Sequence, residues 1–288
     1  MIESGGDPYA EERYVDLHMH STASDGALAP RDVVAAAHRV GLTAIALTDH
    51  DTIDGLAEAE AAGRALGVRV VPGIELSAVD DGDEIHVLGL HLSQPGPLAN
   101  TLAELRETRR ERARATVAIL NSLGVPVTLD AVYLAAGDGA VGRPHIARAL
   151  VAGGWARDFR EAFDRWLGTG KPACVEKRTV TFAEAARLIH ESGGLAIYAH
   201  PGGDATRTEL AARAAEGLDG LEVRHPSHTV DEIARLAMLA EELGLVPSGG
   251  SDWHGGPDGY RALGSMKVSA AWLEMQDERV RQRTEQPA

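Results

Sequence analysis

The chain has 288 residues, of which 44% are hydrophobic and 25% are charged, as in folded globular proteins and unlike disordered chains. Asp and Glu number 43 against 28 Lys and Arg, and the resulting net charge of −15 excludes a basic surface that steers nucleic acid from a distance. The single cysteine, Cys174, excludes an internal disulfide and a zinc site with several Cys ligands. No apolar signal segment or span of about 18 apolar residues is present, so we expect a cytoplasmic protein with no membrane partner. No feature indicates an obligate protein partner.

Seven short apolar segments predict strands that are buried on both faces. They span residues 14–20, 43–51, 68–76, 84–92, 195–202, 220–226 and 246–255. Amphipathic patterns between them predict helices over residues 30–40, 54–66, 181–192, 206–216 and 229–243. Because strand and helix alternate with short connections, we expect an α/β fold whose parallel sheet is closed, or nearly closed, into a barrel.

The alternation stops between about residues 97 and 178. Helical patterns over 98–123, 143–152 and 159–167 occur there without comparable strands, which predicts an inserted, mostly helical subdomain that caps the active site. The barrel would then be discontinuous, formed by residues 14–96 and 179–275, with tails at 1–13 and 276–288, the second of them polar and frayed. Since the insertion follows the fourth strand directly, we expect it to leave the barrel at the rim of the site.

Histidine, aspartate and glutamate residues gather at the predicted strand ends. His18 and His20 end the first strand, where residues two apart face the same side. In parallel barrels the carboxyl ends of the strands carry the active site. The complete set is His18, His20, Asp25, His50, Glu75, His86, His200, Asp252 and His254. Six imidazoles and three carboxylates without a thiolate favour zinc, manganese or iron over magnesium. The sequence therefore predicts a metal centre.

Several segments resemble the polymerase and histidinol phosphatase (PHP) superfamily of metal-dependent phosphoesterases. The matching strings are DLHMHSTASDG, LTDHDT, PGIELS, EIHVLGL, AHPG and GSDWHG. Within the superfamily, HSTASDG, the helical insertion and GRPHIARAL are similar to the branch that includes 3′,5′-nucleotide bisphosphate phosphatases and 5′-to-3′ exoribonucleases acting on short RNA. The resemblance runs from about residue 14 to about residue 268 and implies a distorted parallel (β/α)7-type barrel.

The resemblance also implies three divalent ions per chain, with manganese, zinc or iron as candidates. His18, His20, Glu75 and Asp252 would hold the first ion, Glu75, His86 and His200 the second, and Asp25, His50 and His254 the third. Glu75 would bridge two ions. His91 is an alternative to His86 as the fourth-strand ligand, because some superfamily members take theirs after the glycine, but EIHVLGL favours His86.

A phosphate ester fits this centre, because three divalent ions and three carboxylates leave a net charge of about +3. The resemblance places Arg143 and His145 near the substrate, Lys171 is a further cation that could hold a second phosphate, and His225 could contact phosphate or protonate the leaving group. Each also has a structural interpretation. The arginines of RETRRERAR (106–114) are interpreted as an ion-paired, solvated helix face, with RNA guidance as the alternative.

The expected function is hydrolysis of the 3′-phosphate of nucleotide 3′,5′-bisphosphates, extending to trimming of short single-stranded RNA from the 5′ end. Two alternatives remain open at this point. One is a phosphatase for another small monoester such as histidinol phosphate, and the other is a catalytically silent, metal-stabilised module of the kind attached to polymerases. The intact ligand set counts against the silent module.

Overall fold

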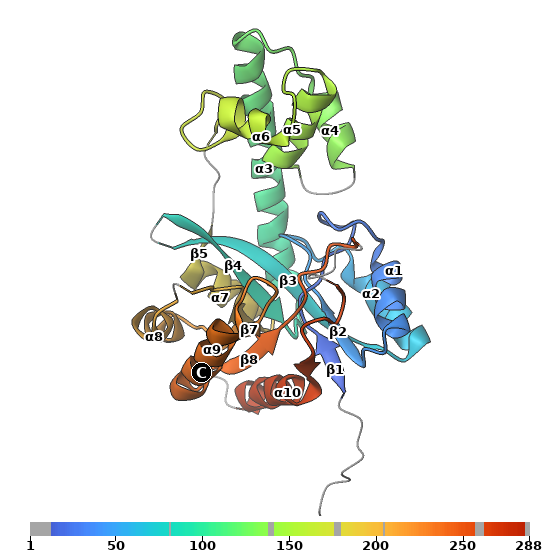
Figure 1. The fold of residues 1–288 in the computed structure, drawn as a ribbon, viewed down its shortest axis with the longest axis vertical. Helices are drawn as coiled ribbons and strands as arrows, with labels where there is room; N and C mark the ends of the chain where they lie inside the picture. The colour runs from blue at the N-terminus through green and yellow to red at the C-terminus, as the bar shows by residue number, and fades with distance from the viewer. Residues whose placement is uncertain are drawn as a thin grey trace, which may run out of the picture.

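Seven strands form the wall of a barrel in the computed structural model of the protein (Figure 1). The structure describes residues 13–80, 82–137, 141–175, 180–203, 205–256 and 262–285. In spatial order the strands are β1 (Tyr14–Asp16), β2 (Ala44–Leu47), β3 (Arg69–Asp80), β4 (Asp83–Leu90), β6 (Leu195–Tyr198), β7 (Gly220–Arg224) and β8 (Val246–Gly249). Two short strands attach to this wall: β9 (Val268–Ser269) pairs with β1, and β5 (Val180–Thr181) pairs with β3. The expected barrel class is confirmed.

The barrel is nearly closed between its first and last strands. Just beyond β1 and β8, the Leu17 N–H group donates to the Gly249 carbonyl at 3.1 Å and the His20 N–H group donates to the Trp253 carbonyl at 3.0 Å. These bonds bring the chain after β1 beside the chain after β8. His18 and His20 therefore lie next to residues 252–254, although they are far apart in the sequence.

Strand β4 runs against its neighbours, so the prediction of a wholly parallel wall was wrong at this strand. It is antiparallel to both β3 and β6, and Asp80 pairs with Asp83 across a tight turn in which Gly82 has a φ of +93°. The sequence held the signal for this hairpin, because Asp-Gly between two apolar runs favours a two-residue turn with positive φ.

The reversal of β4 changes where the insertion leaves the barrel. Leu90, the last residue of β4, pairs with Leu195 at the start of β6, so the chain emerges at the end opposite to the carboxyl ends of the parallel strands. The expectation that the insertion leaves at the rim of the site was therefore wrong. Helix α3 (Gly96–Ser122) starts at this far end, and its 27 residues extend for about 40 Å.

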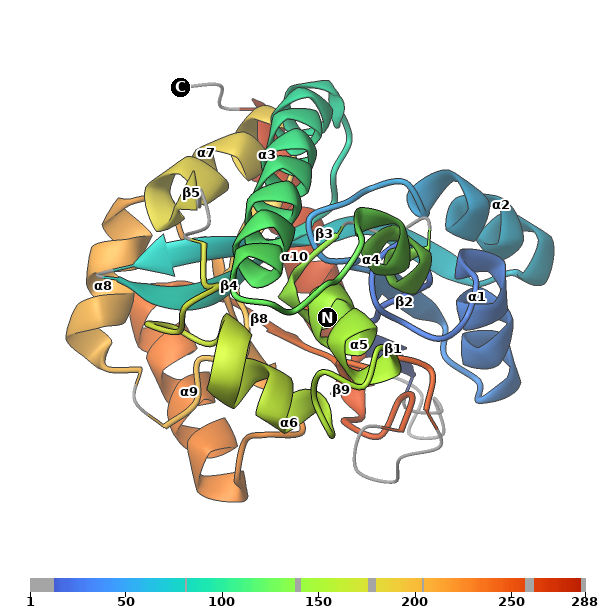
Figure 2. The same ribbon diagram turned by 90° about the horizontal axis from the view of Figure 1, so that it is seen from above.

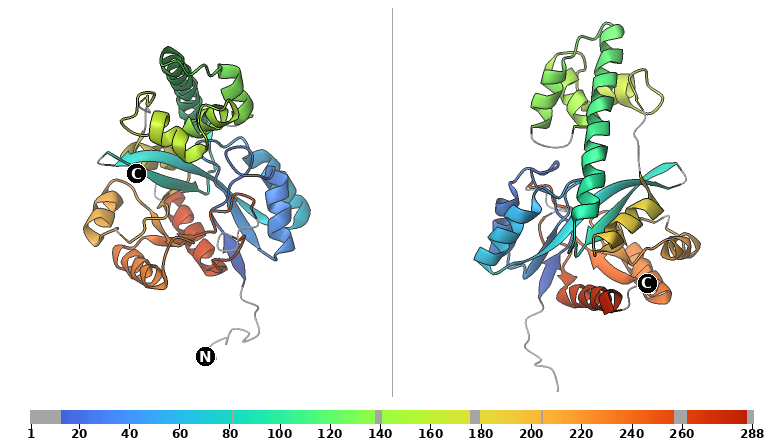
Figure 3. Two further views of the ribbon diagram at one scale, coloured as in Figure 1. Left: turned by 45° about the horizontal axis from the view of Figure 1, so that its top comes forward. Right: turned by 180° about the vertical axis from the view of Figure 1, so that it is seen from behind.

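Helix α3 connects the barrel to the helical insertion, as Figure 3 shows from behind. Leu98 and Leu102 pack with the barrel core beside helix α7 (Phe182–Glu191), whereas Val117 and Leu120 belong to a separate apolar cluster in the insertion. That cluster joins α3 to α4 (Leu129–Ala136), α5 (Arg143–Ala152), α6 (Phe159–Ala162) and the π-helical turn Phe163–Leu167. Seen from above, α5 and α6 lie over the barrel (Figure 2). Helix α4 was not predicted.

The helices around the barrel agree with the predicted patterns to within two residues. They are α1 (Pro30–Arg39), α2 (Leu56–Leu66), α7, α8 (Arg207–Ala215) and α9 (Val230–Leu243). Capping boxes begin α7 and α9: Thr181 Oγ1 accepts the Glu184 N–H group at 3.2 Å, and Thr229 Oγ1 accepts the Glu232 N–H group at 3.3 Å.

Helix α10 (Ala270–Glu285) covers the end of the barrel opposite to the carboxyl ends of the parallel strands, and the prediction of a frayed tail from residue 276 was wrong as far as residue 285. Gln276 is fully buried and donates to the Pro247 carbonyl at 2.9 Å, while Arg283 pairs with Asp219 at 2.5 Å. Polarity alone misled the prediction, because these polar groups bond to the barrel. Residues 286–288 lie outside the described part. Among the described helices, none has the length and apolar character needed to cross a bilayer.

Candidate active site

The predicted metal ligands come together at the carboxyl ends of the parallel strands, with Glu75 at their centre. Its Oε2 atom lies 3.1 Å from His18 Nε2 and 3.2 Å from His20 Nε2. Its Oε1 atom lies 2.7 Å from His86 Nδ1 and 3.2 Å from His200 Nε2. His50 Nδ1 also lies 3.3 Å from Oε2, so the two oxygens of one buried carboxylate face two separate sets of histidines, the arrangement a bridging ligand requires.

The remaining candidates extend this cluster around His20. His254 Nε2 lies 3.4 Å from Asp25 Oδ1, and His50 Nε2 lies 3.9 Å from Asp25 Oδ2. Asp252 Oδ1 lies 3.1 Å from His20 Nε2, on the side of the first pair. All nine predicted residues therefore belong to one cluster, within which Asp25, His50 and His254 form a group with His20.

His91 lies away from this cluster. It follows β4 at the opposite end of the barrel, where its Nε2 atom is 3.2 Å from Gln276 Oε1 and its Nδ1 atom is 3.5 Å from Asp277 Oδ1. Because β4 is reversed, His86 lies near the cluster and His91 near α10. The structure thus brings the preferred candidate to the site and not its alternative.

The donor set fits divalent ions. His20 is fully buried, yet neither of its ring nitrogens makes a hydrogen bond within the described residues. Burial by itself would lower the pKa of His20, but Asp252 and Glu75 outweigh it and raise this pKa to about 9. Burial lowers the pKa of His50 to about 3. Unbonded imidazole nitrogens that converge on ionised carboxylates are the environment that a transition-metal ion satisfies.

Glu222 is a further member of the site that the sequence analysis did not identify. It lies within β7, is fully buried, and places Oε1 2.9 Å from His18 Nδ1, while Oε2 accepts the backbone N–H group of His200 at 2.7 Å. The signal was present in the sequence, because a glutamate inside the apolar run GLEV indicates a buried carboxylate in need of partners.

His225 lies beside the cluster with a defined ring orientation. Its Nδ1 atom accepts the Ser227 N–H group at 3.2 Å, so in the neutral ring the proton is on Nε2. That Nε2 atom is buried, has no hydrogen-bond partner among the described residues, and lies 3.5 Å from Asp252 Oδ2. His228, by contrast, is occupied by the Val223 carbonyl and the Gly202 N–H group, which is a structural role.

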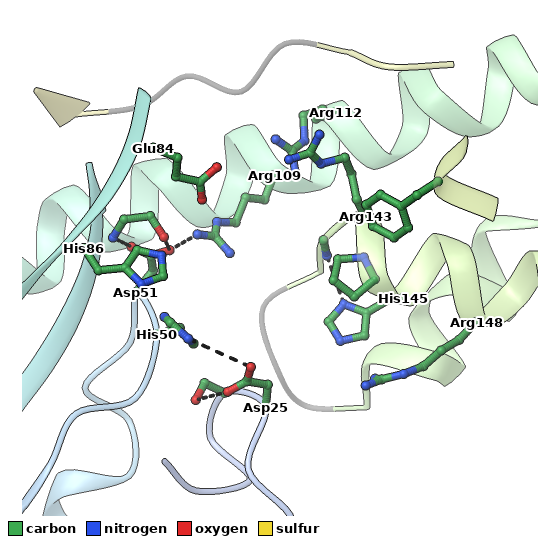
Figure 4. A pocket seen from close by; sticks show the side chains of 15 residues that line it. Asp25, His50, Asp51, Glu84, His86, Arg109, Arg112, Arg143, His145 and Arg148 are labelled. Atoms are coloured by element: carbon green, nitrogen blue, oxygen red, sulfur yellow. Dashed lines mark hydrogen bonds and ion pairs between the residues drawn. The ribbon is translucent and has the colours of Figure 1, made fainter. Parts of the chain in front are cut away.

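A cavity of about 310 Å³ lies between the ligand cluster and the insertion (Figure 4). His50 and His86 line both this cavity and the adjoining hollow that contains Glu75 and His200, so the two spaces are contiguous. The basic residues on the insertion side of the cavity are Arg109, Arg112, Arg143, His145 and Arg148.

The structure brings two of the three predicted substrate residues to this cavity. Arg143 and His145 are at the start of α5 and line it. His145 Nδ1 accepts the Gly142 N–H group at 3.0 Å, which leaves the ring proton on Nε2 in the neutral form. Lys171 is exposed, in the turn that follows the π-helical segment, and is not among the residues that line the cavity.

The interpretation of residues 106–114 as a solvated helix face was wrong for Arg109 and Arg112. Arg109 bonds the buried Asp51 carboxylate. Arg112 lines the cavity beside Arg143, and burial, together with the charge of Arg143, lowers the pKa of Arg112. Arg110 and Arg114 do pair with Glu107 at the surface. The signal lay in the helical spacing, because residues three apart share one face.

The comparisons with known proteins point to one family. The PHP domain family matches residues 16–175. A 5′-3′ exoribonuclease of Haemophilus influenzae is 38% identical over 255 residues, covering 86% of this chain and 92% of the relative. A 3′,5′-nucleoside bisphosphate phosphatase of Chromobacterium violaceum is 37% identical over 257 residues, covering 87% and 90%. A solved structure from Bifidobacterium adolescentis, assigned as a metal-dependent phosphoesterase, superposes with a TM-score of 0.78 at 31% identity, covering 95% and 98%.

Matches over most of the chain, in sequence and in structure, agree with the cluster of metal-binding side chains at the strand ends. The chain therefore belongs to the PHP domain family and is a metal-dependent phosphoesterase.

Proposed function

We propose that this enzyme removes the 3′-phosphate from nucleoside 3′,5′-bisphosphates and trims short RNAs from their 5′ ends. The names of the Chromobacterium and Haemophilus relatives support this substrate class. The observation that carries it is the position of Arg112 and Arg143. These two guanidinium groups lie near each other in a cavity continuous with the ligand cluster, and the repulsion of Arg112 by Arg143 outweighs its attraction to Glu84 in the same cavity.

The ligand cluster holds three divalent ions in this proposal. The first takes His18, His20, Glu75 and Asp252, the second takes Glu75, His86 and His200, and the third takes Asp25, His50 and His254. Divalent ions held there would supply the positive charge and the activation of water that hydrolysis of a phosphate ester needs.

The cavity on the insertion side binds the second phosphate of the substrate. Arg112 and Arg143 repel each other without an anion, and a phosphate between them satisfies both through charge-assisted hydrogen bonds. The Nε2–H group of His145 is a neutral donor at the same wall. A substrate with two phosphates can thus place one on the metal centre and one among these side chains.

His225 serves the reaction at the other wall of the cluster. In its neutral form it carries the proton on Nε2, which lies 3.5 Å from Asp252 Oδ2 beside the ligand cluster. It can therefore donate to a phosphate oxygen or to the leaving oxygen. Helices of the insertion lie over the barrel (Figure 2). We infer that this cover admits a terminal nucleotide and excludes the interior of a strand, which would restrict hydrolysis of RNA to free ends.

The test is a comparison of substrates with metal-reconstituted protein. We expect rapid hydrolysis of a nucleoside 3′,5′-bisphosphate and of short 5′-phosphorylated single-stranded RNA, slow hydrolysis of histidinol phosphate, and almost none of circular RNA. Arg112→Ala should raise KM for the bisphosphate by about tenfold or more while a nucleoside monophosphate is affected little. Arg110→Ala, an exposed neighbour on the same helix, is the matched control.

Two results would contradict the proposal. Equal effects of Arg112→Ala on bisphosphate and monophosphate would show that the cavity does not bind a second phosphate. Efficient cleavage of circular RNA would show that internal phosphodiesters reach the cluster.

A further inference from the structure

We propose that Glu222 is a positioning residue that fixes ligands of two of the three ions, those held by His18 and His200, and leaves the third untouched. This inference rests on the proposed metal centre. Glu222 contacts no reacting atom in this arrangement, and its effect passes through the two histidines.

The first contact orients an imidazole ring. Glu222 Oε1 lies 2.9 Å from His18 Nδ1, on the side of the ring that faces away from Glu75. A carboxylate can only accept at this distance, so it holds the ring proton on Nδ1. The Nε2 lone pair is then directed toward Glu75 and Asp252, 3.1 and 3.5 Å away, where the first ion belongs. Partners of this kind, behind a ligand, fix its tautomer and raise its basicity.

The second contact holds a backbone. Glu222 Oε2 accepts the His200 N–H group at 2.7 Å, and His200 has a φ of +32°, a conformation that residues other than glycine rarely adopt. In this conformation the His200 ring places Nε2 3.2 Å from Glu75 Oε1, where the second ion belongs. The bond from Glu222 therefore stabilises the backbone that presents this ligand.

Both oxygens of Glu222 are occupied by these two hydrogen bonds. Neither of these bonds involves Asp25, His50 or His254, the proposed ligands of the third ion. The group His18, Glu222 and His225 is also close enough to bind an ion directly. One feature argues against that alternative: Glu222 faces His18 Nδ1, whereas His18 Nε2 faces the other predicted ligands.

Glu222→Gln tests the proposal because an amide has one acceptor where two are needed. The NH2 group of the amide is a donor, and it must face either the His200 N–H group or the His18 Nδ1–H group, which are donors themselves. If it faces His18, the ring proton moves from Nδ1 to Nε2, the atom that should bind the metal. Glu241→Gln, an exposed residue of α9, removes the same charge and is the matched control.

The measurement is the number and affinity of bound Mn²⁺ ions in the full chain, by chelator competition and elemental analysis, with folding checked by circular dichroism. Wild type and Glu241→Gln should bind three ions. In Glu222→Gln two of them should bind about 10- to 100-fold more weakly and the third unchanged. Asp25→Ala should give the opposite pattern, loss of the third ion alone. If Glu222→Gln does not fold, Glu222→Asp, which keeps both acceptors on a shorter side chain, should show the same two-ion pattern in weaker form.

Unchanged affinities in Glu222→Gln would overturn the proposal, as would equal weakening of all three ions. Complete loss of one ion with the other two intact would identify Glu222 as a ligand and also overturn it. Fewer than two ions in wild type would refute the proposed metal centre itself, and the positioning role with it, which separates that failure from the others.

Discussion

Replacing Arg109 with methionine should destabilise the enzyme because it leaves a buried carboxylate without its counter-charge. Asp51 accepts the Ser77 N–H group and the Ser77 hydroxyl, each at 2.9 Å, and Arg109 bonds its Oδ2 atom. The Asp51 N–H group itself donates to the Glu75 carbonyl at 2.9 Å. Asp51 thus joins the loop of His50 and the strand of Glu75 to helix α3.

The magnitude follows from the burial of this pair. The exposed fractions are 4% for the Asp51 side chain and 16% for that of Arg109. Opposite charges about 4 Å apart attract by about 4 kcal/mol at an effective dielectric constant of 20, and desolvation offsets part of this. We therefore expect Arg109→Met to lower the free energy of unfolding by about 3 kcal/mol and the coupling energy of the pair to be about 2 kcal/mol.

The assay is a double-mutant cycle in urea with metal-free protein at pH 7, combining Arg109→Met with Asp51→Asn, which keeps the Ser77 contacts. The matched control is the pair Arg106 and Asp54, one helical turn away and with exposed fractions of 36% and 63%, for which we expect less than about 1 kcal/mol. A coupling energy for Arg109 and Asp51 no larger than that of the control pair would refute the reasoning, because it would show that water solvates both charges.

Three further outcomes are expected. Asp25→Ala should release one ion and Glu75→Ala two, by elemental analysis after manganese loading; equal losses would disprove bridging by Glu75. Arg143→Ala should raise KM for a nucleoside bisphosphate more than tenfold at unchanged metal content, which corresponds to a loss of about 1.4 kcal/mol of binding free energy. Unaltered kinetics would show that Arg143 does not bind the substrate. Asp219→Asn should lower the free energy of unfolding by about 2 kcal/mol above pH 5. Burial opposes ionisation of Asp219, but hydrogen bonds and Arg283 hold its pKa below the ordinary value. The difference in unfolding free energy from wild type, measured by urea titration, should therefore shrink as the pH falls below 5 toward the pKa of Asp219 in the folded protein. A difference that stays constant with pH would contradict this.

The sequence predicted the elements of the barrel better than their directions. Short apolar runs and capping residues identify strands and helices because both signals are local. The direction of β4 depends on a single turn, whose only sequence signal is the Asp-Gly pair at 81–82, a much shorter signal than the apolar runs on either side of it. The path of α3 follows from that direction, so one missed turn displaced the start of the whole insertion.

Site residues were predictable where the sequence places them at the end of an apolar run and unpredictable where tertiary packing defines them. His18, Glu75 and Asp252 come at or near the ends of the predicted strands 14–20, 68–76 and 246–255, where the barrel fold places its active site. Glu222 lies in the middle of an apolar run, and Arg112 belongs to a helix that begins at the far end of the barrel. The length of this helix was predictable, but only the packed structure shows that its path brings that arginine to the cavity.

The seam between β1 and β8 sets the order in which the enzyme can mature during synthesis. The bonds that close the barrel join Leu17 to Gly249 and His20 to Trp253, groups separated by more than 200 residues of chain. A ribosome-bound chain can form the early strands and the cap before Asp252, which lies 3.1 Å from His20 in the folded protein, has been synthesised. The complete cluster of metal-binding side chains can therefore assemble only after the last strand of the barrel has been made.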